Sequence, residues 1–89
     1  MPKRIMLAKY GQSEIRVENT WFNGATLFVD GDRVARANDY FIFNKYKPLI
    51  SENVKLDGAE RLVEVFMLAR TTVKIKINVD GRQIGGEVF

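Results

Sequence analysis

The chain has 89 residues, of which 46% are hydrophobic and 28% charged, and this composition predicts one globular domain over residues 1–89 rather than a disordered chain. It contains neither cysteine nor histidine, which excludes disulfides, thiolate nucleophiles, Ser-His-Asp sites and metal sites built on these ligands. The sequence has no apolar run of about 18 residues that would span a membrane. It also has no signal-peptide core, so a cytoplasmic protein is expected.

The first part of the chain predicts a series of short strands. Residues 3–10 form a candidate strand that ends at Gly11. Residues 14–18 alternate strictly, with two β-branched side chains on one face and three charges on the other, as in a half-buried strand. Asn-Gly at positions 23 and 24 indicates a turn before another strand at residues 25–29.

A Val-Asp-Gly motif occurs twice, at residues 29–31 and 79–81, and each copy separates two apolar runs. This pattern predicts two tight β-hairpins. A two-residue turn in the second hairpin places its lysines together on one face, as a sheet with one buried face requires. The predicted cross-strand pairs are Val79 with Arg82, Ile77 with Ile84, Ile75 with Gly86 and Val73 with Val88, and in the first hairpin Val29 with Asp32, Leu27 with Val34 and Thr26 with Ala35.

The middle of the chain holds an aromatic run and an ambiguous segment. Residues 40–43, Tyr-Phe-Ile-Phe, predict a buried strand, and residues 49–56 predict another. Residues 59–70 fit a helix capped by Asp57, but their alternation favours a strand. That strand would form two cross-strand pairs, Val65 with Ile75 and Glu64 with Lys76.

These segments predict an all-β fold, an antiparallel β-sandwich or flattened barrel of about seven or eight short strands, with a helix near residues 59–70 as the alternative. Four segments at residues 27–31, 40–43, 63–65 and 75–81 follow one another in an order that resembles the small β-sandwich domains of Fas apoptotic inhibitory molecule. The resemblance implies the sandwich architecture. The aromatic run departs from that family's tryptophan-containing pattern, and no functional residue is carried over.

Two aromatic residues near a predicted strand end form the first candidate site. Trp21 and Phe22 would make an exposed ligand platform, because flat rings give a large contact area at low entropic cost. The alternative is that these rings fill the thin core of a small domain.

A second candidate lies in the aromatic and basic segment at residues 41–47. Here Lys45, Tyr46 and Lys47 alternate charges with a ring, as single-stranded nucleic-acid-binding proteins do. A core strand followed by a solvated loop explains the same residues. Because the net charge is only +3, nucleic acid is an alternative partner rather than the favoured one.

Carboxylates at predicted turns are better explained by turn chemistry than by calcium binding, because the further ligands of a calcium loop are missing. These residues are Asp30, Asp32, Asp39 and Asp80. No metal or cofactor site is therefore predicted. An enzyme would need an acid–base site built on Asp39, Tyr40 or Glu64, which lack the spacing of a catalytic site. We predict that the chain is not an enzyme, with a small carboxylate-only enzyme as an alternative.

The C-terminal strand is predicted to expose an edge. Unpaired edges are either protected or used for pairing. Lys3, Arg4 and Lys9 would protect the N-terminal strand, whereas the last strand has no lysine. We therefore expect a non-catalytic binding or assembly module that forms a homo-oligomer, with a dimer favoured, through an edge strand. The interface candidates are Ile84, Gly86, Val88 and Phe89.

Overall fold

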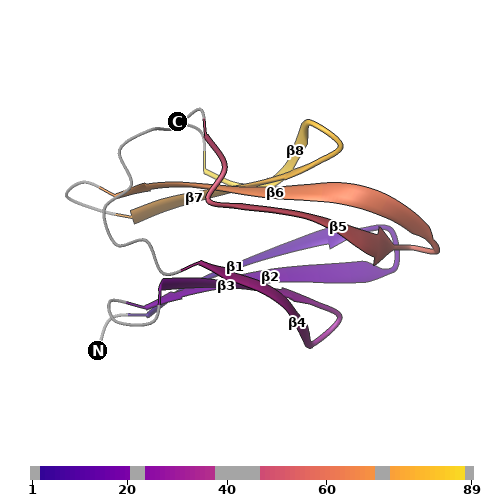
Figure 1. The fold of residues 1–89 in the computed structure, drawn as a ribbon, viewed down its shortest axis with the longest axis horizontal. Coiled ribbons are helices and arrows are strands. Elements are labelled where there is room, and N and C mark those ends of the chain that lie inside the picture. Colours follow the sequence, from indigo (N-terminus) through magenta and orange to yellow (C-terminus); the bar gives the residue numbers. More distant parts are fainter. Residues whose placement is uncertain (1–2, 21–23, 38–46, 70–72, 88–89) are drawn as a thin grey trace.

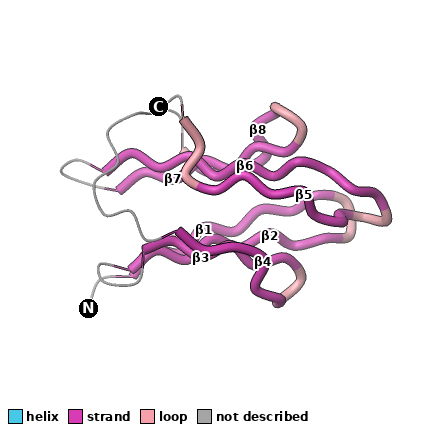
Figure 2. The backbone as a smooth tube through the Cα atoms, viewed as in Figure 1, coloured by secondary structure: helices cyan, strands magenta, loops and turns pink. Residues whose placement is uncertain are grey.

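The computed structural model describes residues 3–20, 24–37, 47–69 and 73–87. In these residues the chain forms two antiparallel sheets of four strands each, stacked as two layers (Figure 1). The first sheet contains β1 (Lys3–Tyr10), β2 (Ser13–Thr20), β3 (Gly24–Val29) and β4 (Asp32–Ala37), and the second contains β5 (Ile50–Leu56), β6 (Ala59–Ala69), β7 (Val73–Val79) and β8 (Arg82–Gly86). Figure 2 shows that the described chain is made of strands and short connections.

The predicted all-β fold is therefore confirmed, and the segment that fitted either a helix or a strand is the strand β6. No helix in the described part of the chain is long and apolar enough to cross a membrane. The strand predicted at residues 40–43 and the first residue of the turn predicted at positions 23 and 24 lie outside the described residues.

Asp-Gly turns connect three of the hairpins in the described residues. Both turn residues have positive φ in each case, which defines a type I′ turn and matches the twist of the flanking strands. The φ values are 51° and 86° at Asp30 and Gly31, 50° and 86° at Asp57 and Gly58, and 50° and 81° at Asp80 and Gly81. The short connections in Figure 2 thus follow directly from the sequence.

The two sheets repeat one local arrangement. In the first, the Asp30 carboxylate accepts a hydrogen bond from the Glu14 N–H (2.8 Å), and the Asp30 N–H donates to the Glu14 carbonyl oxygen (2.9 Å). In the second, Asp80 makes the same two bonds with Leu62, at 3.0 and 2.8 Å. Each turn is thus fastened to the strand next to it, so the sandwich consists of two similar four-stranded meanders.

Both Val-Asp-Gly hairpins contain a β-bulge, and this corrects the predicted register. The pairs nearest the turns, Val29 with Asp32 and Val79 with Arg82, are confirmed. The next pairs were wrong because Val34 and Ile84 are extra residues without a partner in the ladder. The structure instead pairs Leu27 with Ala35, Thr26 with Arg36, Ile77 with Gly85 and Lys76 with Gly86. The predicted partner of Val73, residue 88, lies outside the described residues.

The register between β6 and β7 also differs from the prediction. Val65 pairs with Ile77 and Glu64 with Asn78, two residues further along β7 than expected. The cause is that β6 continues to Ala69, so the connection to β7 begins later than the sequence indicated.

The core lies between the two sheets and takes side chains from both. It consists of buried aliphatic residues at alternate positions, as a strand with one inward face requires. These residues are Ala8, Ile15, Val17, Ala25, Leu27, Val29, Ile50, Val54, Leu56, Val63, Val65, Met67, Ile75, Ile77 and Val79. Val34 and Ile84, the two bulge residues, are partly buried and pack against this core.

Candidate assembly edge on the first sheet

The strand β1 carries apolar side chains on both faces between residues 5 and 8. The inward side chain of Ala8 is buried, because β8 approaches it at Gly85, where a Cβ atom would lie only 2.7 Å from the Ala8 Cβ. The outward side chains of Ile5 and Leu7 remain 49% and 57% exposed. They are the large hydrophobic side chains that stay exposed in the described residues. Both exposed large hydrophobic side chains of the described residues thus lie on β1.

The backbone of β1 leaves hydrogen-bonding groups without a partner strand. In an antiparallel ladder only alternate residues bond to a given neighbour. Tyr10 and Ser13 flank a two-residue turn, so the even-numbered residues of β1 bond to β2. Ile5, Leu7 and Lys9 then direct their N–H and C=O groups away from the sheet. In the described chain β1 has no ladder with any strand except β2.

The other three sheet edges in the described residues carry features that hinder pairing with a further strand. A bulge interrupts both β4 and β8, and bulges prevent the regular pairing of an edge with another strand. The outward positions of β5 are polar and exposed, at Ser51, Asn53 and Lys55. By contrast, β1 keeps an unbroken register over all eight of its residues. It is the edge on which a further strand would fit best.

Charged side chains cover the outward face beside β1. The Arg16 guanidinium lies over the Phe28 ring, 4.4 Å from its centroid, and the Arg16 Nε lies 3.1 Å from the Glu18 carboxylate. Lys9 is opposite Glu14 in the ladder. A partner packed flat on this face would have to desolvate these charges. A partner added at the edge of β1 would leave most of them in water.

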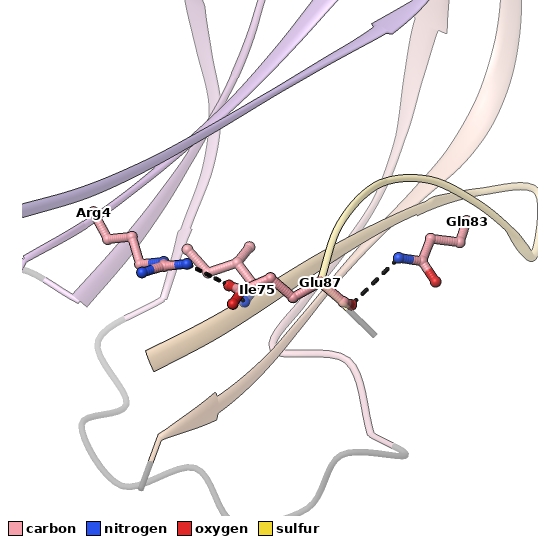
Figure 3. Close-up of polar contacts among 4 residues, drawn as sticks. All are labelled: Arg4, Ile75, Gln83 and Glu87. Carbon is pink, nitrogen blue, oxygen red and sulfur yellow. Dashed lines mark hydrogen bonds and ion pairs between the residues drawn. The ribbon is translucent and has the colours of Figure 1, made fainter. Parts of the chain in front are cut away.

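The edge of β8, where the sequence predicted the interface, is anchored to its neighbours. The Glu87 carboxylate accepts hydrogen bonds from Arg4 Nη2 of β1 (2.6 Å) and from the Ile75 N–H of β7 (3.3 Å), as Figure 3 shows. The Gln83 side-chain amide donates to the Glu87 carbonyl oxygen (3.3 Å). Of the predicted interface residues, Ile84 is half-buried against the core and Gly86 is exposed, and Val88 and Phe89 lie outside the described residues.

A polar cluster fastens the turn end of β1 to the second sheet. The buried Ser13 hydroxyl accepts a hydrogen bond from the Asp57 N–H (2.9 Å), and the Asp57 carboxylate accepts one from the Gln12 N–H (3.3 Å). The Arg61 guanidinium lies 5.2 Å from the centroid of the Tyr10 ring. These contacts hold the two sheets together beside the end of β1, and they leave Ile5 and Leu7 untouched.

Within this cluster, an ion pair shifts the pKa of both its members. Arg61 Nη1 donates to the Asp80 carboxylate at 2.9 Å. The Leu62 N–H and then Arg61 lower the pKa of Asp80 below its usual value, because both stabilise the charged carboxylate. The hydrogen bond to Asp80 in turn raises the pKa of Arg61. The Arg61–Asp80 ion pair therefore depends on the ionised form of Asp80.

The predicted ligand-binding residues fall mostly outside the described chain. Trp21, Phe22, Lys45 and Tyr46 are not described, and Lys47 is exposed. The nucleic-acid alternative needs aromatic rings on which bases can stack. Besides Phe28, the described ring on an outward sheet face is Phe66. It is buried, and the Lys76 ammonium lies 4.8 Å from its centroid. Cations thus already lie over the rings of both Phe28 and Phe66.

The predicted acid–base residues are not brought together in the described chain. Asp39 and Tyr40 lie outside it, and Glu64 is half-buried between Ser51 of β5 and Asn78 of β7. Asp32, at the turn between β3 and β4, is exposed. Among the described residues no group of three or more acidic side chains could hold a metal ion.

Sequence reasoning missed the importance of Ile5 and Leu7. The available signal was the run of apolar residues at positions 5–8 inside a terminal strand. An edge strand of a two-layer sandwich has one outward face, so a strand that is apolar on both faces must expose one set.

Comparisons with protein-family models, with curated proteins and with solved structures find no match for this chain. The resemblance to Fas apoptotic inhibitory molecule therefore stays a prediction from the sequence.

Proposed function

We propose that this protein is a non-catalytic assembly module whose copies associate through the edge of β1. The observation that carries the proposal is the combination of two exposed apolar side chains, Ile5 and Leu7, with an unbulged edge strand. Strand addition at such an edge gains main-chain hydrogen bonds as well as side-chain contacts.

The protection of the other edges supports β1 as the site of assembly. Natural sheet proteins avoid unwanted pairing by placing bulges or charged residues on their edges. In the described chain the other three edges carry these features, whereas the basic residues in the sequence of β1 occur only near its ends. Arg4 forms an ion pair with Glu87. The middle of the strand, residues 5–8, is apolar.

The non-catalytic part of the proposal rests on the residue types present. Without histidine or cysteine, general acid–base and nucleophilic chemistry would depend on carboxylates, tyrosine, lysine or hydroxyl groups alone. Two of the described acidic residues have structural roles instead: Asp30 fastens a turn to the neighbouring strand, and Asp80 does the same and pairs with Arg61.

The test compares Leu7→Lys with a control, Ser51→Lys, that adds the same charge to the exposed edge of β5. Both positions are exposed, so each variant should fold with a stability within about 0.5 kcal/mol of wild type. Light scattering during gel filtration, over a range of protein concentrations, should give an oligomer for wild type and Ser51→Lys and a monomer for Leu7→Lys. A wild-type monomer at every concentration, or a Leu7→Lys variant that still associates like wild type, would refute the proposal.

Lysine at Ile84, in the strand first predicted to form the interface, is a poorer test. Ile84 packs against the core, so a charge there would disturb the fold as well as any contact between chains.

A further inference from the structure

We infer that the partner strand is β1 of a second copy, paired antiparallel about a two-fold axis that passes between the two Leu7 residues. This inference rests on the proposed function and specifies its geometry. The first sheets of the two chains would then join into one continuous sheet, with Ile5 and Leu7 of both copies on the same outward face. The inference follows from the backbone alternation, the extent of β1 and the positions of its lysines.

The backbone alternation limits the possible registers. Both copies direct the hydrogen-bonding groups of their odd-numbered residues toward the partner, so odd residues must face odd residues. In a symmetric antiparallel pair this requires that one residue of the strand faces the same residue of the other copy, with the two-fold axis between them. The axis can therefore lie at residue 5, 6, 7 or 8 if a useful length of β1 is to be paired.

The extent of β1 then favours the middle of the strand. With the axis at Ile5, only residues 3–7 of each copy would overlap, and with the axis at Ala8 only residues 6–10 would, because β1 is Lys3–Tyr10. An axis at Met6 or Leu7 pairs a longer part of the strand. Each further paired residue contributes contacts and, at alternate positions, main-chain hydrogen bonds.

The charged residues that face each other distinguish the two remaining registers, with the axis at Met6 or at Leu7. An axis at Met6 places Lys3 directly opposite the partner's Lys9, twice in each dimer, and like charges directly opposite one another are destabilising. An axis at Leu7 instead places Lys9 opposite the partner's Ile5, where the aliphatic part of the lysine can cover the isoleucine and the ammonium group stays in water. The register centred on Leu7 therefore has the fewest conflicts.

The same geometry explains why a second copy is the expected partner and why assembly stops at two. Every chain carries the same unbulged edge with an exposed apolar middle, and a two-fold contact uses it once on each chain. The remaining edges at β4, β5 and β8 carry bulges or polar residues. Among the described strands no equivalent edge is left to extend the sheet, so the predicted product is a closed dimer rather than a fibre.

Single cysteines provide a direct test, because the chain has none of its own. In the inferred register, Leu7→Cys faces its own copy as a hydrogen-bonded pair, with Cα atoms about 5.5 Å apart, a separation that suits a disulfide. Ile5→Cys lies four residues away from its copy along the strands, about 14 Å, which is too far. Asn53→Cys, on the exposed edge of β5, is the control that measures how much disulfide forms by random collision. Each variant is equilibrated in a glutathione redox buffer at a concentration where wild type is dimeric.

The expected result is a disulfide-linked dimer from Leu7→Cys and only the collisional background from Ile5→Cys and Asn53→Cys. Efficient linkage of Ile5→Cys alone, or only of a mixture of Ile5→Cys with Leu7→Cys, would overturn the register but leave assembly through β1 intact. Equal linkage of all three variants would overturn the inference as well. A wild-type chain that is monomeric throughout would overturn both the inference and the proposed function.

A measurement without substitution covers the case in which cysteine at position 7 weakens association. Isotope-filtered NMR on a mixture of labelled and unlabelled wild-type chains detects contacts between copies only. A Leu7-to-Leu7 methyl contact supports the inferred axis. Intermolecular contacts that leave out Leu7 contradict it.

Discussion

Three glycines in the last hairpin predict a graded loss of stability when each is replaced by alanine. Gly81 has a φ of +81° and no atom within 4 Å of an added Cβ, so Gly81→Ala isolates backbone strain. An L-residue in the left-handed region costs about 1–2 kcal/mol. Gly86 has a φ of +93°, and its added Cβ would also collide with the Ile75 carbonyl oxygen and lie 2.8 Å from the Lys76 Cα. A clash with backbone cannot be relieved by a rotamer change.

Overpacking of this kind typically costs about 1–3 kcal/mol. We therefore expect Gly86→Ala to lower the free energy of unfolding by about 2–5 kcal/mol, the sum of strain and clash. A chain of this length is stabilised by only about 4–13 kcal/mol. At Gly85 the obstacle is the Ala8 Cβ, 2.7 Å away, without positive φ, so Gly85→Ala should cost about 1–3 kcal/mol by overpacking alone.

The assay is urea unfolding followed by circular dichroism, with the three variants compared at an unchanged m-value. The expected order of loss has Gly86→Ala above both of the others. A Gly86→Ala variant as stable as Gly81→Ala would show that β8 does not approach β7 as described, and it would refute the bulged register.

Two further predictions concern the polar cluster at the turn end of β1. Because the folded state lowers the pKa of Asp80, the stabilisation from its carboxylate is present above the unfolded pKa of about 4 and is lost as pH falls through the lower folded value. The stability difference between wild type and Asp80→Asn, measured by urea unfolding, should therefore shrink as pH falls below about 4, and a difference that does not change with pH would contradict this. Ser13→Ala leaves the Asp57 N–H without its partner and should cost about 1–3 kcal/mol, whereas an unchanged unfolding midpoint would show that water replaces the hydroxyl.

The turns and strand faces could be predicted from the sequence because they depend on local chemistry. An Asp-Gly pair between apolar runs favours a type I′ turn wherever it occurs, and the alternation around Ile15 and Val17 specifies a buried face. The strand at residues 59–69 could also be predicted, since its β-branched residues fit a strand better than a helix.

The bulges could not be predicted because they depend on contacts between distant residues. Regular alternation pairs Ile77 with Ile84, and nothing local indicates that Ile84 should leave the ladder. The structure places Gly85 opposite Ile77 instead, where the absence of a side chain lets β8 approach Ala8 of the other sheet. The extra residue is therefore set by the packing of the two sheets.

The candidate edge was hidden from sequence reasoning for a related reason. Residues 5–8 are apolar at every position, so the pattern does not show which face of β1 is buried. Burial of Ala8 follows from its contact with β8, and that contact decides that Ile5 and Leu7 face outward.

Amide hydrogen exchange of β1 at two protein concentrations tests the central claim most directly. If copies pair through this edge, the amides of Ile5 and Leu7 should exchange rapidly when the protein is dilute and slowly when it is concentrated. The amides of Met6 and Ala8, which bond to β2, should be protected at both concentrations. Rapid exchange at Ile5 and Leu7 at every concentration would contradict the claim that this strand is the site of assembly.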